Sequence, residues 1–456
     1  MRTRHSFAGS LVLCVVTWFA VAMTPPPVSA ADRVEARFRK LLLGRQDRAR
    51  LMAIESVAGN FQSRMKALPV IIESLEKLRD DPRFNRLDKQ GLPDLPDGVH
   101  RMIQVLGTVD QPDATDALVG LLDGQRRSWS MAAVQVLCEN QHHAAITRVA
   151  NQVDSDFFRH SYGYRFTLAR GLKSMKHPDA WDALATVYDR VDGQLAHRLR
   201  EEFKTVKPED FKGDEERFAK WRSLVGLSGE PEAAPLDDAF SRAAAILGES
   251  NGGSGEAKPQ ERSLQPSASA ASYRRKHLKP SQYYGIEIYA KRLLFIIDRS
   301  GSMGTVVGNR SRIDRAKQEL ATAINGLDPE CEFGLLVFDS EIRAWREELV
   351  PADEDNKLDA IRFIQYLGTG NTTNTYGVLR RALEFDEQLE AVFMLTDGQP
   401  TSGRLINPSA ILTDILRRNE VHHLTINAIA IAVEPTMATF LKKLSEPSNG
   451  EYRDVK

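Results

Sequence analysis

Three oxygen-bearing side chains alternate in the stretch "LLFIIDRSGSM" (293–303), namely Asp298, Ser300 and Ser302. Carboxylate and hydroxyl oxygens are hard ligands, the kind that Mg²⁺ and Ca²⁺ prefer. Two more such side chains occur downstream, Thr373 in "GTGNTTNTYGVL" and Asp397 in "VFMLTDGQPTSG". Together the five side chains are candidate ligands of one divalent cation, provided that the fold brings them together.

The surrounding sequence predicts the elements that would position these side chains. "RLLFIID" and "AVFMLTDG" are short apolar runs ended by polar residues and Gly, which is typical of strands buried on both faces. Asp298 and Asp397 lie at the tips of these strands, and Thr373 lies in a loop just before a helical pattern. In open α/β sheets the carboxyl ends of the strands meet at one edge, where ligands bind. We therefore expect the five side chains to converge there.

Strands and helices alternate from Tyr283 to the end of the chain. Only "EFGLLVFD" and "EIRAWREEL" are expected to form neighbouring strands joined by a tight turn. This order predicts a doubly wound, mostly parallel sheet with helices on both faces. The expected helices are "RIDRAKQELATAINGL", "NKLDAIRFIQYL", "TYGVLRRALEF", "SAILTDILRRN" and "TMATFLKKLSE", and the remaining strands are "LTINAIAIA" and "GEYRDV".

In their order along the chain, the motifs "DRSGS", "TTNTYGVL" and "TDGQPTSG" resemble those of the von Willebrand factor type A domain with its metal-ion-dependent adhesion site. The resemblance covers roughly residues 283–456 and does not extend to the N-terminal half. It implies that the hydroxyls of Ser300, Ser302 and Thr373 coordinate the metal, while Asp298 and Asp397 act directly or through water. It also implies that a partner protein supplies an Asp or Glu carboxylate to the metal.

The charges of the candidate ligands indicate that a bound cation stays electrophilic. Two carboxylates balance the charge of a divalent cation, and three hydroxyls add no further charge. One coordination position is then open to water or to an incoming oxygen. Few carboxylates and several neutral oxygens suit the small octahedral Mg²⁺, with Ca²⁺ and Mn²⁺ as alternatives.

The N-terminal half contains an internal repeat. "LGTVDQPDATDAL" and "LKSMKHPDAWDAL" share "PDA" and "DAL" in register, and "LCENQHHAAITRV" lies between them. Pro-Asp pairs suit the first turn of a helix. Two-helix repeats a little over thirty residues long predict an all-α solenoid similar to HEAT-type repeats over residues 31–226. The spacing also fits a TPR-like array, but the Trp and Tyr pattern of that repeat is missing.

Two segments lie outside both predicted domains. Residues 1–30 have basic residues, an apolar run and "VSAAD", which indicate a secretory signal peptide cleaved after Ala30. A retained membrane anchor is the alternative. Residues 227–282 are rich in Gly, Ser, Pro and Ala and are expected to be a flexible linker that tethers the domain of residues 283–456.

Composition limits the classes of function. A formal net charge of −1 gives no overall attraction to nucleic acid or to anionic membranes. Beyond the signal peptide, Cys138 and Cys331 are far apart in sequence and are expected to be buried free thiols rather than a disulfide. No H-E-x-x-H, G-x-S-x-G or P-loop motif is present, so we expect no enzyme.

Taken together, the sequence predicts an exported interaction or adhesion scaffold in the periplasm, at the cell surface or secreted. It would bind partner carboxylates through a Mg²⁺ site, and its helical repeats would add a second surface and hence avidity. One alternative is an accessory subunit of an extracytoplasmic enzyme or transport assembly, and a weaker one is a Mg²⁺-dependent hydrolase. No transmembrane helix is expected after signal cleavage, and the partner and oligomeric state stay open.

Overall fold

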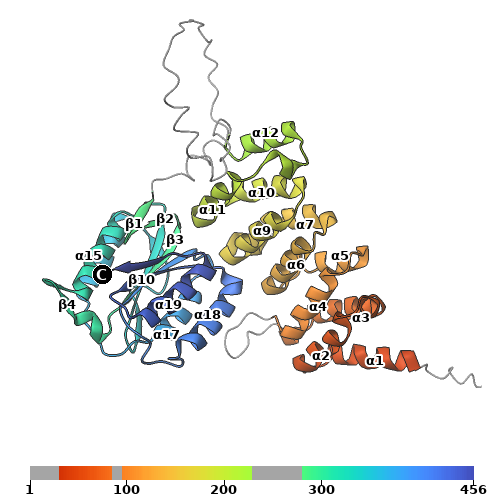
Figure 1. The fold of residues 1–456 in the computed structure, drawn as a ribbon, viewed down its shortest axis with the longest axis horizontal. Coiled ribbons are helices and arrows are strands. Elements are labelled where there is room, and N and C mark those ends of the chain that lie inside the picture. Colours follow the sequence, from red (N-terminus) through yellow and green to blue (C-terminus); the bar gives the residue numbers. More distant parts are fainter. Residues whose placement is uncertain (1–29, 85–94, 228–279, 456) are drawn as a thin grey trace, which may run out of the picture.

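The computed structural model describes residues 30–84, 95–227 and 280–455, which form two parts (Figure 1). The first part, up to residue 227, is all-helical, and the second is a mixed sheet with helices on both faces. Both fold classes predicted from the sequence are thereby confirmed. Apart from their ends, the predicted signal peptide (1–30) and linker (227–282) lie outside the described residues.

The N-terminal part is a stack of short helices. They are α1 (Ala30–Leu43), α2 (Asp47–Ala58), α3 (Phe61–Arg79), α4 (Asp97–Gly107), α5 (Pro112–Val119), α6 (Arg127–Glu139), α7 (Ile146–Ala150), α8 (Asp156–His160), α9 (Tyr162–Ser174), α10 (Pro178–Arg190), α11 (Gly193–Phe203) and α12 (Glu215–Leu224). In one layer α2, α4, α6 and α9 pack in succession. In a second layer α3 packs on α5, and farther along α7 packs on α10 and α10 on α12.

The repeated sequence positions lie inside this stack. Pro112 and Pro178 each begin a helix, α5 and α10, where the missing N–H has no intrahelical acceptor in any case. Ala114, Ala180 and Leu184 are fully buried between the layers. The two alanines are small, which lets neighbouring helices approach closely. The assignment of this stack to the HEAT type stays a prediction.

Seven strands form the central sheet of the second part. They are β3 (Arg292–Asp298), β6 (Glu332–Phe338), β7 (Ile342–Ala344), β8 (Val350–Pro351), β9 (Ala391–Thr396), β10 (Thr425–Ile431) and β11 (Tyr452–Val455). The order is β11-β10-β9-β3-β6-β7, and β8 also pairs with β6. All pairs are parallel except those that β7 and β8 make with β6. The predicted hairpin in a mostly parallel sheet is therefore present.

Two layers of helices cover the sheet because its strands are apolar on both faces. Along β3, Phe295 and Ile297 pack toward one layer, while Leu294 and Ile296 pack toward the other. The first layer contains α15 (Arg312–Asn325) and α16 (Glu354–Gln365), and the second contains α17 (Thr375–Leu383), α18 (Pro408–His422) and α19 (Pro435–Ser445).

Two short hairpins were not predicted from the sequence. The first, β1 (Ser281–Tyr283) with β2 (Ile286–Ile288), packs on α15. The second, β4 (Val306–Val307) with β5 (Arg310–Ser311), follows the "DRSGS" loop and leads into α15.

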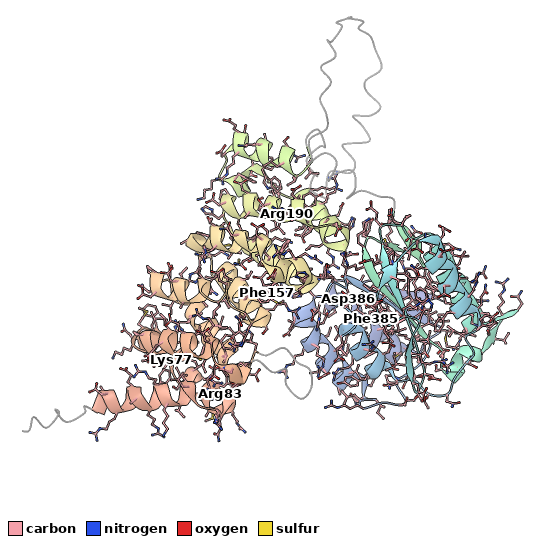
Figure 2. The ribbon with its side chains drawn as sticks, turned by 180° about the vertical axis from the view of Figure 1, so that it is seen from behind. Lys77, Arg83, Phe157, Arg190, Phe385 and Asp386 are labelled. Carbon is pink, nitrogen blue, oxygen red and sulfur yellow. The ribbon has the colours of Figure 1, made fainter. Side chains whose placement is uncertain are left out.

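The two parts of the molecule pack directly against each other, which the sequence did not predict. The backbone N–H of Tyr162, at the start of α9, donates to the carbonyl of Glu387 at 3.0 Å. Figure 2 shows this junction from the opposite side, with Phe157 on the helical side and Asp386 on the α/β side. The α/β part is therefore held by more than the linker predicted from residues 227–282.

Aromatic stacking and close backbone contact reinforce the junction. The rings of Phe166, on α9, and His423 stack with their centroids 4.7 Å apart. Burial lowers the pKa of His423 to about 4, which keeps the imidazole neutral against the phenyl ring. Gly163 of α9 lies so close to α18 that an added Cβ would come within 2.0 Å of the Val421 carbonyl oxygen.

A buried carboxylate also lies at the junction. Glu390, just before β9, accepts hydrogen bonds from the backbone N–H groups of Gln194 (2.8 Å) and Lys291 (3.3 Å). Burial, reinforced by repulsion from Asp192, raises the pKa of Glu390 to about 7. Arg198 of α11 donates to the hydroxyl of Thr425 at 2.8 Å. Because Glu390 and Thr425 lie at the amino ends of β9 and β10, the helical stack covers the amino-terminal edge of the sheet (Figure 1).

Among the described residues, the longest apolar helical segments fall short of what a bilayer crossing requires. Cys138 and Cys331 are both buried and unbridged, as the sequence analysis favoured.

Candidate metal site

The first candidate ligand lies at the end of the central strand β3. Its apolar residues are buried, and the strand ends at Asp298, whose side chain is inaccessible to solvent. One oxygen of Asp298, Oδ1, accepts a hydrogen bond from the backbone N–H of Ser300 at 2.7 Å. The other, Oδ2, accepts from the hydroxyl of Thr396 at the end of β9, at 2.6 Å. These two bonds fix the carboxylate at the carboxyl-terminal edge of the sheet.

The two serines follow at a tight 3-10 turn over Gly301–Gly304, with Ser300 directly before the turn and Ser302 inside it. The buried side chain of Met303 anchors this turn in the core beneath. The Oγ atoms of Ser300 and Ser302 lie 3.1 Å apart, and the hydroxyl of Ser302 donates to Asp397 Oδ1 at 2.7 Å. Thus the "DRSGS" loop and the "TDG" loop meet through side-chain oxygens.

Thr373 reaches the same place from the loop before α17. Its backbone N–H donates to the hydroxyl of Thr401 at 2.9 Å, and its carbonyl accepts from the N–H groups of Thr401 (2.9 Å) and Ser402 (3.2 Å). A Cβ added to Gly398 would lie 3.5 Å from Ser302 Oγ and 3.6 Å from Thr373 Oγ1. The hydroxyls of Ser302 and Thr373 therefore flank one small space that glycine leaves open.

The electrostatics of this edge favour a cation. Burial raises the pKa of Asp298 to about 6, although hydrogen bonds from Thr396 and Ser300 oppose the rise. The neighbouring carboxylate of Asp397 adds to it by repulsion. Two carboxylates that repel each other in a buried setting are stabilised by a positive ion between them.

The donor set suits a hard divalent ion. The structure brings the two carboxylates and the hydroxyls of the five predicted residues to one edge, and hard oxygens of this kind suit Mg²⁺ or Ca²⁺. Four of these side chains, Asp298, Ser300, Thr373 and Asp397, are buried, so their positions are fixed by packing.

Two further residues of the site were missed in the sequence analysis. Thr396 holds Asp298 in place, and its position directly before "DG" at a strand tip was an available signal. Arg312, the first residue of α15, donates from Nη1 to Asp397 Oδ2 at 2.7 Å. No local pattern distinguishes Arg312 from a solvent-facing helix residue, because its partner lies 85 positions away.

A second ion pair lies beside the site. Arg299 donates from Nη2 to Asp339 Oδ2 at 2.8 Å, and its carbonyl accepts from the N–H of Gly370. The backbone N–H of Asn374, next to Thr373, donates to the Asp339 carbonyl at 2.8 Å. This network ties the "DRSGS" loop to the loop that contains Thr373.

Comparisons with known proteins agree with this geometry. Residues 293–399 match the family model of the von Willebrand factor type A domain. The chain is 29% identical over 182 residues to inter-alpha-trypsin inhibitor heavy chain H4 of Homo sapiens, which covers 38% of this chain and 19% of that protein. It is also 29% identical over 162 residues to von Willebrand factor A domain-containing protein 3B of Homo sapiens, covering 35% of this chain and 11% of that protein.

The matched segments thus span only a small share of these relatives, about a fifth of the first. Among solved structures, a von Willebrand factor type A protein from Catenulispora acidiphila matches at 20% identity and a TM-score of 0.32, covering 37% of this chain and 40% of that one. Domains of this family typically bind a divalent metal at an adhesion site of the kind that the five residues resemble. With its sheet order, its ordered motifs and the matched family model, the C-terminal part of this chain is a von Willebrand factor type A domain.

Proposed function

We propose that the C-terminal domain binds a divalent cation, foremost Mg²⁺, with Ca²⁺ and Mn²⁺ as substitutes, at one edge of its sheet. The observation that carries this proposal is the contact between the two motif loops, Ser302 Oγ at 2.7 Å from Asp397 Oδ1 and at 3.1 Å from Ser300 Oγ. The ligands are Asp298, Ser300, Ser302, Thr373 and Asp397.

The bound cation would supply an electrophilic position for one external oxygen. We propose that an Asp or Glu carboxylate of a partner protein occupies this position. Hydrogen bonds within this chain fix the positions of the proposed ligands. Thr396 orients Asp298, and the bonds between Thr401 and the backbone of Thr373 fix the loop that contains Thr373. The exposed Ser302 marks the side from which a partner can approach.

Calorimetric titration of Mg²⁺ tests this proposal. Asp397→Ala leaves a doubly charged ion facing a single carboxylate, so the affinity for Mg²⁺ should fall by more than about tenfold. Ser302→Ala should cost less, because water can replace one neutral hydroxyl. Thr373→Ala should weaken Mg²⁺ binding to an intermediate extent but impair partner binding severely.

The matched control is Asp359→Asn on α16, where the carboxylate pairs with Arg346 at the surface. It removes one acidic charge from the same domain and should leave the affinity for Mg²⁺ unchanged. All of these variants should keep the fold of the wild type, because the core consists of apolar strands, and melting curves check this; Asp397→Ala should melt at a lower temperature, because it also leaves Arg312 without its partner. Equal Mg²⁺ affinity in the wild type and in Asp397→Ala would refute the proposed site.

For the whole chain we propose an exported interaction or adhesion scaffold, divided as 1–30, 31–226, 227–282 and 283–456. The placement of the helical stack supports this proposal, because it covers the amino-terminal edge of the sheet and leaves the opposite edge, with the metal ligands, open (Figure 1). A HEAT-like stack would then offer a second binding surface. Export is tested by N-terminal sequencing of native protein, which should begin at Ala31.

We propose binding rather than catalysis. The groups that contact the candidate ligands are hydroxyls, backbone amides and Arg312, which is already paired. A screen of phosphatase and esterase substrates with Mg²⁺ should show no turnover. Recovery of one stoichiometric enzyme with the native protein would instead favour the role of an accessory subunit.

A further inference from the structure

The two oxygens of the Asp397 carboxylate have different partners, one of which is Arg312. Oδ1 accepts from the hydroxyl of Ser302, while Oδ2 accepts from Nη1 of Arg312 at 2.7 Å. The carboxylate of Asp397 is fully buried, and only 16% of the Arg312 side chain is exposed. One oxygen thus faces the predicted metal ligands and the other faces a fixed positive charge.

The backbone holds Arg312 at this place. The N–H of Arg312 donates to the carbonyl of Thr305 at 3.0 Å, directly before the hairpin that follows the "DRSGS" loop. Ser311 caps α15 by accepting from the N–H of Asp314. The N–H of Thr305 in turn donates to the carbonyl of Ser302 at 3.0 Å, so backbone hydrogen bonds link Arg312 to the serine loop.

Neighbouring arginines are engaged elsewhere. Arg299 pairs with Asp339, and Arg315, one turn along α15, donates to the carbonyl of Val307 at 2.8 Å. Among the described residues, a single basic side chain, that of Arg312, lies within ion-pair distance of a candidate ligand carboxylate.

This contact changes the charge balance of the site. The two candidate carboxylates together contribute −2, which a divalent ion cancels to zero. With Arg312 counted, the protein groups contribute −1, and a bound divalent ion leaves a net charge of +1. A partly buried site with a net positive charge attracts an incoming carboxylate, whereas a neutral one does so only through the open coordination position.

We infer that Arg312 is a positioning and selectivity residue that keeps the metal-loaded site positive and so selects anionic ligands. It weakens the binding of the cation and strengthens the binding of the carboxylate that follows. The inference rests on the proposed function, since it requires that Asp397 serve as a metal ligand.

The test compares Arg312→Gln and Arg312→Met, two neutral side chains of different polarity, with the wild type. Mg²⁺ affinity is measured by calorimetry. Affinity for a carboxylate is measured with acetate as the probe, from the relaxation of its methyl protons by Mn²⁺ bound to the protein. Arg315→Gln is the matched control, because it removes a charge from the same helix without a contact to Asp397.

Both neutral variants should bind Mg²⁺ at least about fivefold more tightly and acetate at least about threefold more weakly, the sign expected when one positive charge beside the ion is lost. Arg312→Lys should stay close to the wild type, as should Arg315→Gln. The opposite signs matter, because a residue that merely held Asp397 in place would weaken both equilibria when replaced.

Three outcomes would overturn the inference. If the neutral variants bind Mg²⁺ more weakly at an unchanged melting temperature, Arg312 only holds the carboxylate in place. If their affinities for both probes equal those of the wild type, Arg312 has no role, although the metal site stands. If the wild type binds neither Mg²⁺ nor Mn²⁺, the proposed function fails and the inference fails with it.

Discussion

Replacing Glu390 with glutamine should stabilise the molecule at alkaline pH and have little effect at acidic pH. The Glu390 side chain is 2% exposed, and it accepts hydrogen bonds from the N–H groups of Gln194 and Lys291. A glutamine oxygen can accept the same two bonds. The substitution therefore removes the charge and keeps these two hydrogen bonds, while the ion pair of Glu390 with Arg292 at 4.0 Å is lost together with the charge.

The magnitude follows from the pKa. Burial, with repulsion from Asp192, raises the pKa of Glu390 from 4.5 to about 7, while Arg165 and Arg292 oppose the rise. A raised carboxyl pKa means that the folded state holds the proton more tightly than the unfolded state. The resulting stability is fully present below pH 4.5 and is lost as the pH rises through 7. The shift corresponds to about 3 kcal/mol of unfolding free energy between these limits.

Urea unfolding of the wild type and of Glu390→Gln at pH 4.5 and pH 8.5 measures this difference. Tryptophan fluorescence follows both parts, since Trp221 lies in the helical stack and Trp345 in the α/β domain. The gain in unfolding free energy of the variant over the wild type should be larger by about 3 kcal/mol at the higher pH. Glu387→Gln, an exposed position of the same junction, is the matched control. An equal difference at both pH values would refute the reasoning.

Two further predictions concern packing. Gly163→Ala should separate the two parts without unfolding either, because its Cβ would come within 2.0 Å of the Val421 carbonyl oxygen. Small-angle scattering should then show a larger radius of gyration. The control Gly59→Ala, at a position with open space around it, should leave the radius of gyration unchanged. Ala180→Asp should lower the unfolding free energy of the helical stack by at least about 3 kcal/mol, because it buries an unpaired charge. Thermal circular dichroism should show this loss. The control Thr186→Asp, on the exposed face of α10, should show no such loss.

The convergence of the five candidate ligands at one edge of the sheet was predictable because the signals for it are local. Each candidate ligand follows an apolar strand or precedes a helix within a few residues, and parallel strands place their carboxyl ends together. Arg312 carries no such signal, since the segment "SRIDRAK" has the composition of any solvent-facing helix start. Only tertiary structure shows that this arginine turns toward Asp397.

The junction was missed for a similar reason, although one signal was present. Glu390 lies directly before "AVFML", the apolar run of strand β9, where a carboxylate without a local partner indicates a contact from elsewhere. The first hairpin also carried a signal. Ile286 and Ile288 alternate with a polar residue after Gly285, whose φ of +76° fits a tight turn. These segments are short, so they were overlooked beside the longer periodic patterns.

The helical stack and the proposed metal ligands lie at opposite edges of the sheet, which has a mechanical consequence. A partner held at the metal would pull on the carboxyl ends of β3 and β9, while an assembly held at the helices would pull on the amino ends of β9 and β10. Such a load runs along the strands. Separating β3 from β6 or β9 would then require many parallel hydrogen bonds to break together rather than one after another. The strands at the centre of the sheet are thus oriented to bear tension between two partners in shear, the direction in which paired strands resist separation most strongly.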